Sequence, residues 1–245
     1  MRDKYIIKPF NSVYLITTFL YAVFLFALIK LLSGLDESKK ALCVILFCLL
    51  ALVVFYLYKK AISVDEEYFR MYGFDKFNWL NELPLNVCNI VLIFAPIGIA
   101  FNNQYLMSMS FFASVILSPM AILMPCMGFE KYSIFVPRVL GFYLTHYMAI
   151  STGILMYVLG LFKPSLSQIP VITCMMFVLS VVIYLINKYM RIKNLNPAAN
   201  YFYNVDPENN PVLQLCYKLI PHEFFFVMPV YAVFIIICAL LTIIL

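Results

Sequence analysis

Long apolar runs separated by short polar segments dominate the chain. A helix that crosses about 30 Å of hydrocarbon needs roughly 20 apolar residues at 1.5 Å per residue. Because the runs are continuously apolar, without the alternating polarity of barrel strands, they favour membrane helices. The pattern predicts seven spans, at approximately residues 13–32, 41–58, 84–101, 105–124, 139–161, 169–187 and 224–245.

Composition supports the same fold class. Of the 245 residues, 64% are hydrophobic and only 12% are charged, about half the charged fraction of a typical soluble domain. The apolar material is spread evenly along the chain, so we expect one integral membrane domain over residues 1–245. The sequence therefore predicts an all-α, polytopic membrane protein with seven transmembrane helices.

The distribution of basic residues predicts the orientation in the membrane. With seven spans the two termini lie on opposite faces, and cytoplasmic loops are normally enriched in Lys and Arg. Of the 17 Lys and Arg residues, 13 fall on the face of the N-terminus, and the other face carries Lys30, Lys39, Lys40 and Lys163. We therefore expect a cytoplasmic N-terminus in a multi-pass protein of the cell membrane. These charges are scattered among loops, which argues against a nucleic-acid partner.

Two cytoplasmic connections, residues 59–83 and 188–223, are long. The second contains apolar residues at helical spacing over 212–220, which is typical of a helix lying flat at the membrane interface. Such a helix would be suited to cover a site within the membrane. Oligomeric state does not follow from the sequence.

A few polar residues stand where lipid should exclude them. His146 lies within the fifth span, and a buried membrane histidine needs a hydrogen-bond partner and often marks a functional site. At the start of the third span, Glu82, Asn86 and Asn89 are spaced to share one helical face, and Cys88 lies between the two asparagines. Glu82 and Arg138 precede spans three and five and could pair across the cytoplasmic mouth, although charges at such a rim are usually solvated.

Cys88 and His146 are predicted to lie in nearly the same membrane layer. Counted from the cytoplasmic starts of their helices, they are about 6 Å and about 10 Å deep. A histidine beside a cysteine is the minimum apparatus of nucleophilic acyl chemistry, in which imidazole removes the thiol proton and thiolate attacks an ester. Asn86 or Asn89 could donate to the developing oxyanion. No CxxC spacing or glycine-rich phosphate loop is present, so we expect neither a metal nor a cofactor.

Four stretches carry a resemblance to a known family: LPLNVC at 83–88, the histidine at 146, GLFKPS at 160–165 and NYFYNVDPENNPVLQL at 200–215. In this order they resemble the YwaF-like integral membrane proteins, over roughly residues 83–245. Asn86 stands where that family commonly has histidine, whereas Cys88 and His146 match. The resemblance implies a seven-helix protein related to a eukaryotic ether-phospholipid acyltransferase, with Cys88 and His146 as its active site. Asn200 and Tyr201 match the family's Asn-Tyr pair, which could close the site around a substrate.

Two hypotheses follow for the function. The first is a phospholipid acyltransferase or acyl-ester hydrolase acting at the inner leaflet on an acyl-lipid substrate. In this hypothesis Cys88 and His146 are catalytic, and Asn86, Asn89, Asn200 and Tyr201 bind the substrate. The alternative is a noncatalytic membrane protein, either a small-solute transporter or a lipid-binding accessory subunit, whose polar residues form a binding cavity.

Overall fold

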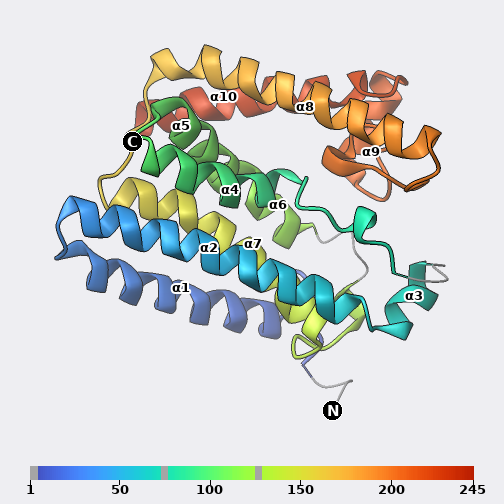
Figure 1. Ribbon diagram of the computed structural model, residues 1–245, viewed down its shortest axis with the longest axis horizontal. Coiled ribbons are helices and arrows are strands. Elements are labelled where there is room, and N and C mark those ends of the chain that lie inside the picture. The colour runs from blue at the N-terminus through green and yellow to red at the C-terminus, as the bar shows by residue number, and fades with distance from the viewer. Residues whose placement is uncertain (1–4, 73–76, 125–128) are drawn as a thin grey trace.

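The computed structural model, which describes residues 5–72, 77–124 and 129–245, is a bundle of helices. The long helices run side by side, and the start of α1 and the end of α10 lie at opposite ends of the bundle (Figure 1). One end, called the α9 end below, holds α3 and α9. The predicted all-α, polytopic fold is confirmed.

The described helices, with α-helices labelled α and 3-10 or π turns labelled η, are α1 (Ser12–Ser33), α2 (Glu37–Ile62), α3 (Glu66–Tyr72), η1 (Trp79–Asn81), α4 (Val87–Ala100), α5 (Gln104–Phe112), η2 (Ala113–Leu117), α6 (Ser118–Leu123), η3 (Phe129–Lys131), α7 (Pro137–Val158), η4 (Leu166–Gln168), α8 (Ile169–Ile192), η5 (Tyr201–Tyr203), α9 (Pro211–Leu219), η6 (Phe225–Val227) and α10 (Met228–Ile244).

Six helical segments in the described part of the chain are long and apolar enough to cross a membrane. They correspond to six of the seven predicted spans, and α4 corresponds to the seventh. With 14 residues, α4 covers only about 21 Å at the helical rise. Helix α4 is therefore shorter than a helix that spans the membrane normally is.

Two local features lie just before the start of α4. The residue before a proline is disfavoured from the helical conformation, so Pro84 discourages helix immediately upstream of it. Asn86, with φ −79° and ψ 152°, is extended, and α4 begins at the next residue. The predicted helical face of Glu82, Asn86 and Asn89 is therefore wrong, because only Asn89 lies within the helix.

Helix α7 forms the centre of the bundle and packs against α2, α4, α5 and α6. Within its most apolar window 78% of residues are buried in protein, compared with 6% for α1. The same window has a mean hydropathy of 1.3 in α7 and 2.3 in α1. The central helix can carry more polar side chains because protein, and not lipid, surrounds it. This difference explains why His146 is tolerated in α7.

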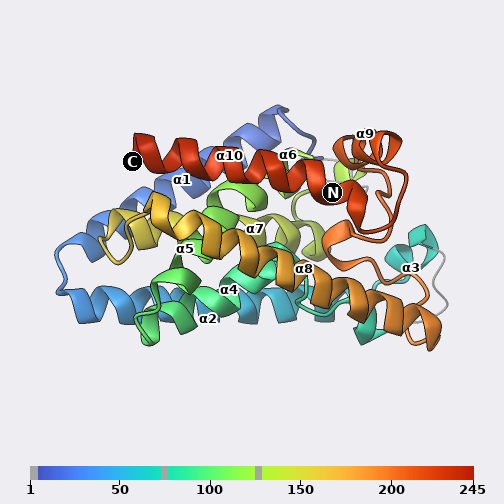
Figure 2. The same cartoon turned by 90° about the horizontal axis from the view of Figure 1, so that it is seen from above.

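The segment from Gln104 to Leu123 crosses the bundle with a change of helix type. Its middle, η2, is a π-helix, in which the backbone N–H of Ser118 donates to the carbonyl of Ala113. Pro119, which has no N–H to donate, lies in the first turn of α6. The wider turn ends at Leu117 and sets the direction in which α6 leaves it, toward the α9 end (Figure 2).

The amphipathic helix predicted over 212–220 is present as α9. Leu213 and Cys216 are buried and cluster with Phe226 and Val227, whereas Leu215 and Leu219 are exposed. One apolar face of α9 therefore packs on the start of α10, and other apolar side chains point outward. Its location at the membrane interface stays a prediction.

The orientation is testable with single cysteines. Ser38→Cys, in the first turn of α2, should react with an impermeant maleimide added outside cells, whereas Lys193→Cys, after α8, should react only after the membrane is opened. Both side chains are exposed in the bundle. The reverse pattern would contradict the orientation predicted from the basic residues. Of those residues, Arg2, Lys4 and Lys76 lie outside the described part of the chain.

Close approach of α2 to α7 depends on Gly141. A Cβ atom there would lie 2.5 Å from the Cβ of Tyr58, which is closer than real Cβ atoms approach. We expect Gly141→Ala to lower the free energy of unfolding by about 1–3 kcal/mol through overpacking. The measurement is thermal unfolding of the purified protein in detergent. Gly34→Ala is the control because a Cβ atom added at Gly34 would meet nothing within 4 Å, and equal effects of both variants would refute the packing argument.

Candidate functional site

A cavity of about 300 Å³ lies within the bundle toward the α9 end. It is lined by side chains from α2, α4, α6, α7, α8 and α10 and by the segment 202–213, which covers it. Four of the six predicted site residues line it: Asn86, Cys88, Asn89 and His146. The cavity thus brings together, from α4 and α7, side chains that the sequence separates by almost sixty positions.

His146 has a fixed orientation on α7. Its Nδ1 lies 2.7 Å from the carbonyl oxygen of Phe142, one turn earlier. Because a carbonyl oxygen only accepts hydrogen bonds, this contact places the ring proton on Nδ1 and leaves the lone pair on Nε2. The side chain is only 8% exposed, and that exposure is toward the cavity. His146 is therefore arranged to receive a proton through Nε2.

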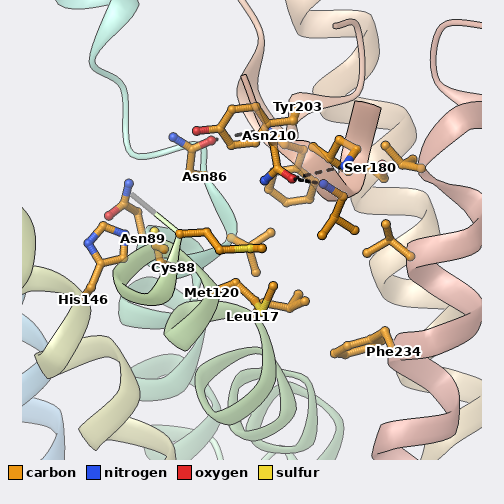
Figure 3. A pocket seen from close by; sticks show the side chains of 18 of the residues that line it. Asn86, Cys88, Asn89, Leu117, Met120, His146, Ser180, Tyr203, Asn210 and Phe234 are labelled. Carbon is orange, nitrogen blue, oxygen red and sulfur yellow. Dashed lines mark hydrogen bonds between the residues drawn. The ribbon is translucent and has the colours of Figure 1, made fainter. Parts of the chain in front are cut away.

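Cys88 and Asn89 lie in the first turn of α4, beside the cavity. Cys88 is half-buried and Asn89 is 5% exposed. In Figure 3 both gather with His146 at one end of the cavity. This end combines a thiol, an amide and an imidazole, which are the groups that nucleophilic acyl chemistry requires.

Asn86 connects α4 to the segment that covers the cavity. It occupies the N-cap position, yet its side chain makes no capping bond and instead accepts from the backbone N–H of Phe202, at 3.3 Å. Phe202 itself lines the cavity and has a positive φ of 63°. Asn86 thus holds a strained turn of the covering segment against the start of α4.

Tyr201 does not line the cavity but supports the backbone beside it. Its hydroxyl donates to the carbonyl of Leu80 at 2.6 Å and accepts from the N–H of Leu83 at 3.1 Å. Its own backbone N–H and carbonyl are both bound by the side chain of Asn187. Burial raises the pKa of Tyr201 to about 12, so the hydroxyl keeps the proton that it donates. Direct contact of Tyr201 with substrate stays a prediction.

Asn200 likewise lies outside the cavity lining and closes a turn of its own. Its amide group donates to the carbonyl of Asp206 and to Glu208 Oε1, each at 2.7 Å, and its oxygen accepts from the N–H groups of Val205 and Asp206. The structure gives Asn200 a role in shaping the covering segment, and its predicted contact with substrate is untested.

One charged pair at the cavity was not predicted. Lys59 lines the cavity, and its ammonium group donates to Glu82 Oε2 at 2.5 Å, with both side chains about nine-tenths buried. The hydroxyl of Tyr68 donates to the other carboxylate oxygen, at 3.2 Å. In the sequence Lys59 follows a predicted span beside the exposed Lys60, and nothing in that pattern separates a buried lysine from a solvated one.

Glu82 and Arg138 neither pair with each other nor stay solvated, so both readings of these two charges are wrong. Arg138, which is 1% exposed, binds Asp65 and lies 3.4 Å from Glu67. Its guanidinium also lies over the ring of Tyr132, at 4.1 Å. Each cation binds the acid that the fold brings nearest, so the two pairs tie different loops to the bundle.

Comparison with known proteins places the chain in a family. The model of the TMEM164 family matches residues 6–245. Searches of curated proteins and of solved structures find no match. The chain is thus an integral, multi-pass membrane protein by family as well as by fold, and its contact with membrane lipid follows.

The Lys59–Glu82 pair yields a stability test. We expect Lys59→Met to cost about 3–5 kcal/mol, because it leaves a buried, uncompensated carboxylate at Glu82. The double variant Lys59→Met/Glu82→Leu should recover most of that loss, since no unpaired charge remains. Thermal unfolding in detergent measures the stability of the single and the double variant. Lys60→Met, which changes the exposed neighbour, is the control. If the double variant is as unstable as the single one, the loss of stability does not come from an unpaired charge.

Proposed function

We propose that this chain, which belongs to the TMEM164 family, is a lipid acyltransferase or acyl-ester hydrolase of the inner leaflet of the cell membrane. Cys88 is the nucleophile and His146 is the general base. One observation carries the proposal: both residues line the same cavity, and the bond from His146 to Phe142 leaves Nε2 free to accept the thiol proton.

The first half of the reaction forms an acyl-enzyme. His146 Nε2 removes the proton from Cys88 Sγ, and the thiolate attacks the carbonyl carbon of the lipid ester. Collapse of the tetrahedral intermediate breaks the ester carbon–oxygen bond, and imidazolium returns the proton to the departing alkoxide. The products are a thioester on Cys88 and a lipid lacking one acyl chain.

The second half returns the enzyme to its starting state. His146 removes a proton from the hydroxyl of an acceptor, whose oxygen attacks the thioester carbonyl, and Cys88 leaves and regains the proton. A lysolipid acceptor makes the protein an acyltransferase, and water makes it a hydrolase. The sequence of bond changes balances without a metal or a cofactor.

The asparagines supply polar contacts in this scheme. Asn89, buried beside Cys88, is placed to donate from its amide nitrogen to the oxyanion, since that interaction strengthens as the charge develops. Asn86 binds the covering segment through its oxygen, which leaves its amide nitrogen for the substrate. Asn200 and Tyr201 act on the substrate indirectly, by shaping the segments on either side of Asn86.

Two further features support a lipid substrate. The cavity lies among helices that cross the membrane and is lined mainly by apolar side chains, which suits an acyl chain better than a small polar solute. The resemblance of LPLNVC and His146 to the YwaF-like proteins, with their relation to an ether-phospholipid acyltransferase, points to the same chemistry. The noncatalytic alternative, a carrier or lipid-binding subunit, would use the cavity without the thiol.

An electrophilic probe tests the nucleophile directly. In membranes containing the full chain, an alkyne-tagged electrophilic lipid should label Cys88, and His146→Ala should lower the labelling rate about 100-fold or more, because the base contributes 10²–10⁴-fold. Mass spectrometry of the labelled peptides identifies the position. Cys174→Ala, which removes an exposed cysteine of α8, is the matched control and should leave labelling unchanged.

Lipid profiles provide the second readout. Cells carrying Cys88→Ala or His146→Ala should share the profile of cells that lack the protein, whereas cells with Cys174→Ala should match the wild type. If Cys88 is labelled at the same rate with and without His146, and the lipid profile is unchanged in all variants, the noncatalytic alternative is favoured.

A further inference from the structure

The cavity has two chemically different ends. Lys59, Asn86, Cys88, Asn89 and His146 make up its polar end. Its other end is mainly apolar, with Leu117, Met120, Met176 and Phe234, and carries the hydroxyl groups of Ser180 and Tyr231 beside Met176. Figure 3 shows Leu117 and Met120 on one side of the apolar end and Phe234 on the other. A cavity with a reactive polar end and a long apolar end matches an amphiphile better than a uniformly polar or apolar ligand.

The apolar end is bounded by helices that come from different parts of the chain. Leu117 ends the π-helix η2, Met120 lies in α6, Met176 in α8 and Phe234 in α10. Methionine and leucine side chains adapt to irregular shapes, and a thioether is polarisable, so these walls suit a flexible hydrocarbon. Among the residues that the structure describes, no charged side chain lines this end.

The α9 end of the cavity is covered. Phe202, Tyr203, Asn210 and Leu213 of the covering segment line it, and Asn210 is held in place because its side chain caps the first turn of α9. A hydrocarbon chain that reached the cavity from the aqueous phase would have to displace this segment. A route from the side avoids that cost.

The α6 side of the cavity borders the bilayer. Met120 lines the cavity and is nevertheless 41% exposed. Because α6 belongs to a membrane-spanning segment, exposed side chains there contact lipid chains. On the opposite side, α10 presents Val230 to the cavity and the exposed Val233 to the surroundings. A lipid chain beside Met120 is therefore already next to the cavity.

We propose that the apolar end is an acyl-chain subsite, filled by one chain of a membrane glycerolipid that enters sideways from the bilayer between α6 and α10. The position of the chain's ester next to Cys88 rests on the proposed function, whereas binding of the chain does not. Met120 forms the lateral opening, and Phe234 lies across the subsite from it.

Photo-crosslinking tests the subsite without any turnover. The Cys88→Ala protein is placed in nanodiscs that contain a phosphatidylcholine with a diazirine at the end of one acyl chain, and irradiated. Crosslinks should appear at Met176 or Phe234, which line the cavity and are otherwise buried in protein. Met120→Trp should reduce them at least tenfold, because the larger side chain fills the opening.

Leu123→Trp is the matched control. Leu123 also lies in α6 and is 38% exposed, but it does not line the cavity, so crosslinking there should be unchanged. Crosslinks confined to lipid-facing positions such as Val233, and equal in all variants, would overturn the subsite. Because crosslinking of Cys88→Ala needs no turnover, it is read separately from activity. Crosslinks inside the cavity, together with an unmutated protein that transfers no acyl chain, would keep the subsite and reject the enzyme.

Chain selectivity gives an independent measurement if the protein is active. Phe234→Leu should shift the preferred acyl chain toward longer chains, with about a tenfold change in the ratio of rates, since one or two methylene groups in an apolar pocket are worth that much. Melting of the variant verifies that it is folded. A folded, active variant with the wild-type chain preference would contradict the placement of the chain against Phe234.

Discussion

The need to satisfy every backbone hydrogen bond inside the membrane layer governs this structure. Non-helical backbone is tolerated at that depth only where protein buries it and supplies partners. The non-helical residues just before α4 likewise have their backbone groups bonded by protein. Tyr201 bonds the carbonyl of Leu80 and the N–H of Leu83, and Asn196 donates a second bond to Leu80 at 3.0 Å. Since α4 can begin late only because these partners exist, the position of Cys88 depends on side chains more than a hundred residues away.

The buried charged residues near the cavity also need partners from other parts of the chain. Lys59 in α2 and Glu82 before α4 are both buried, and each neutralises the other where neither could remain alone. Tyr68 brings α3 into the network through its bond to Glu82. The pair joins α2 to the loop that leads into α4, and Gly141 lets α7 approach α2 closely enough to bring His146 to the same cavity. The polar end is therefore assembled by contacts between helices and not by any one motif.

The covering segment links the reactive end to the amphipathic helix α9. Asn86 holds the turn at Phe202, Asn210 caps α9, and α9 packs on the start of α10 while it exposes apolar side chains. One continuous set of contacts thus runs from Cys88 to an amphipathic helix. In the proposed enzyme this arrangement keeps water from the thioester and leaves the bilayer side of the cavity for the lipid.

The sequence by itself determined the helices, the membrane class and the residues of greatest chemical interest, because apolar length and a lone polar side chain in lipid are local signals. Cys88, His146, Asn86 and Asn89 could be named from it. It did not determine where α4 starts, that Lys59 pairs with Glu82, or that Leu117, Met120 and Phe234 extend the cavity. Those facts depend on which helix faces lie against one another. Only the tertiary structure decides that, since an apolar side chain facing a cavity and one facing lipid look the same in sequence.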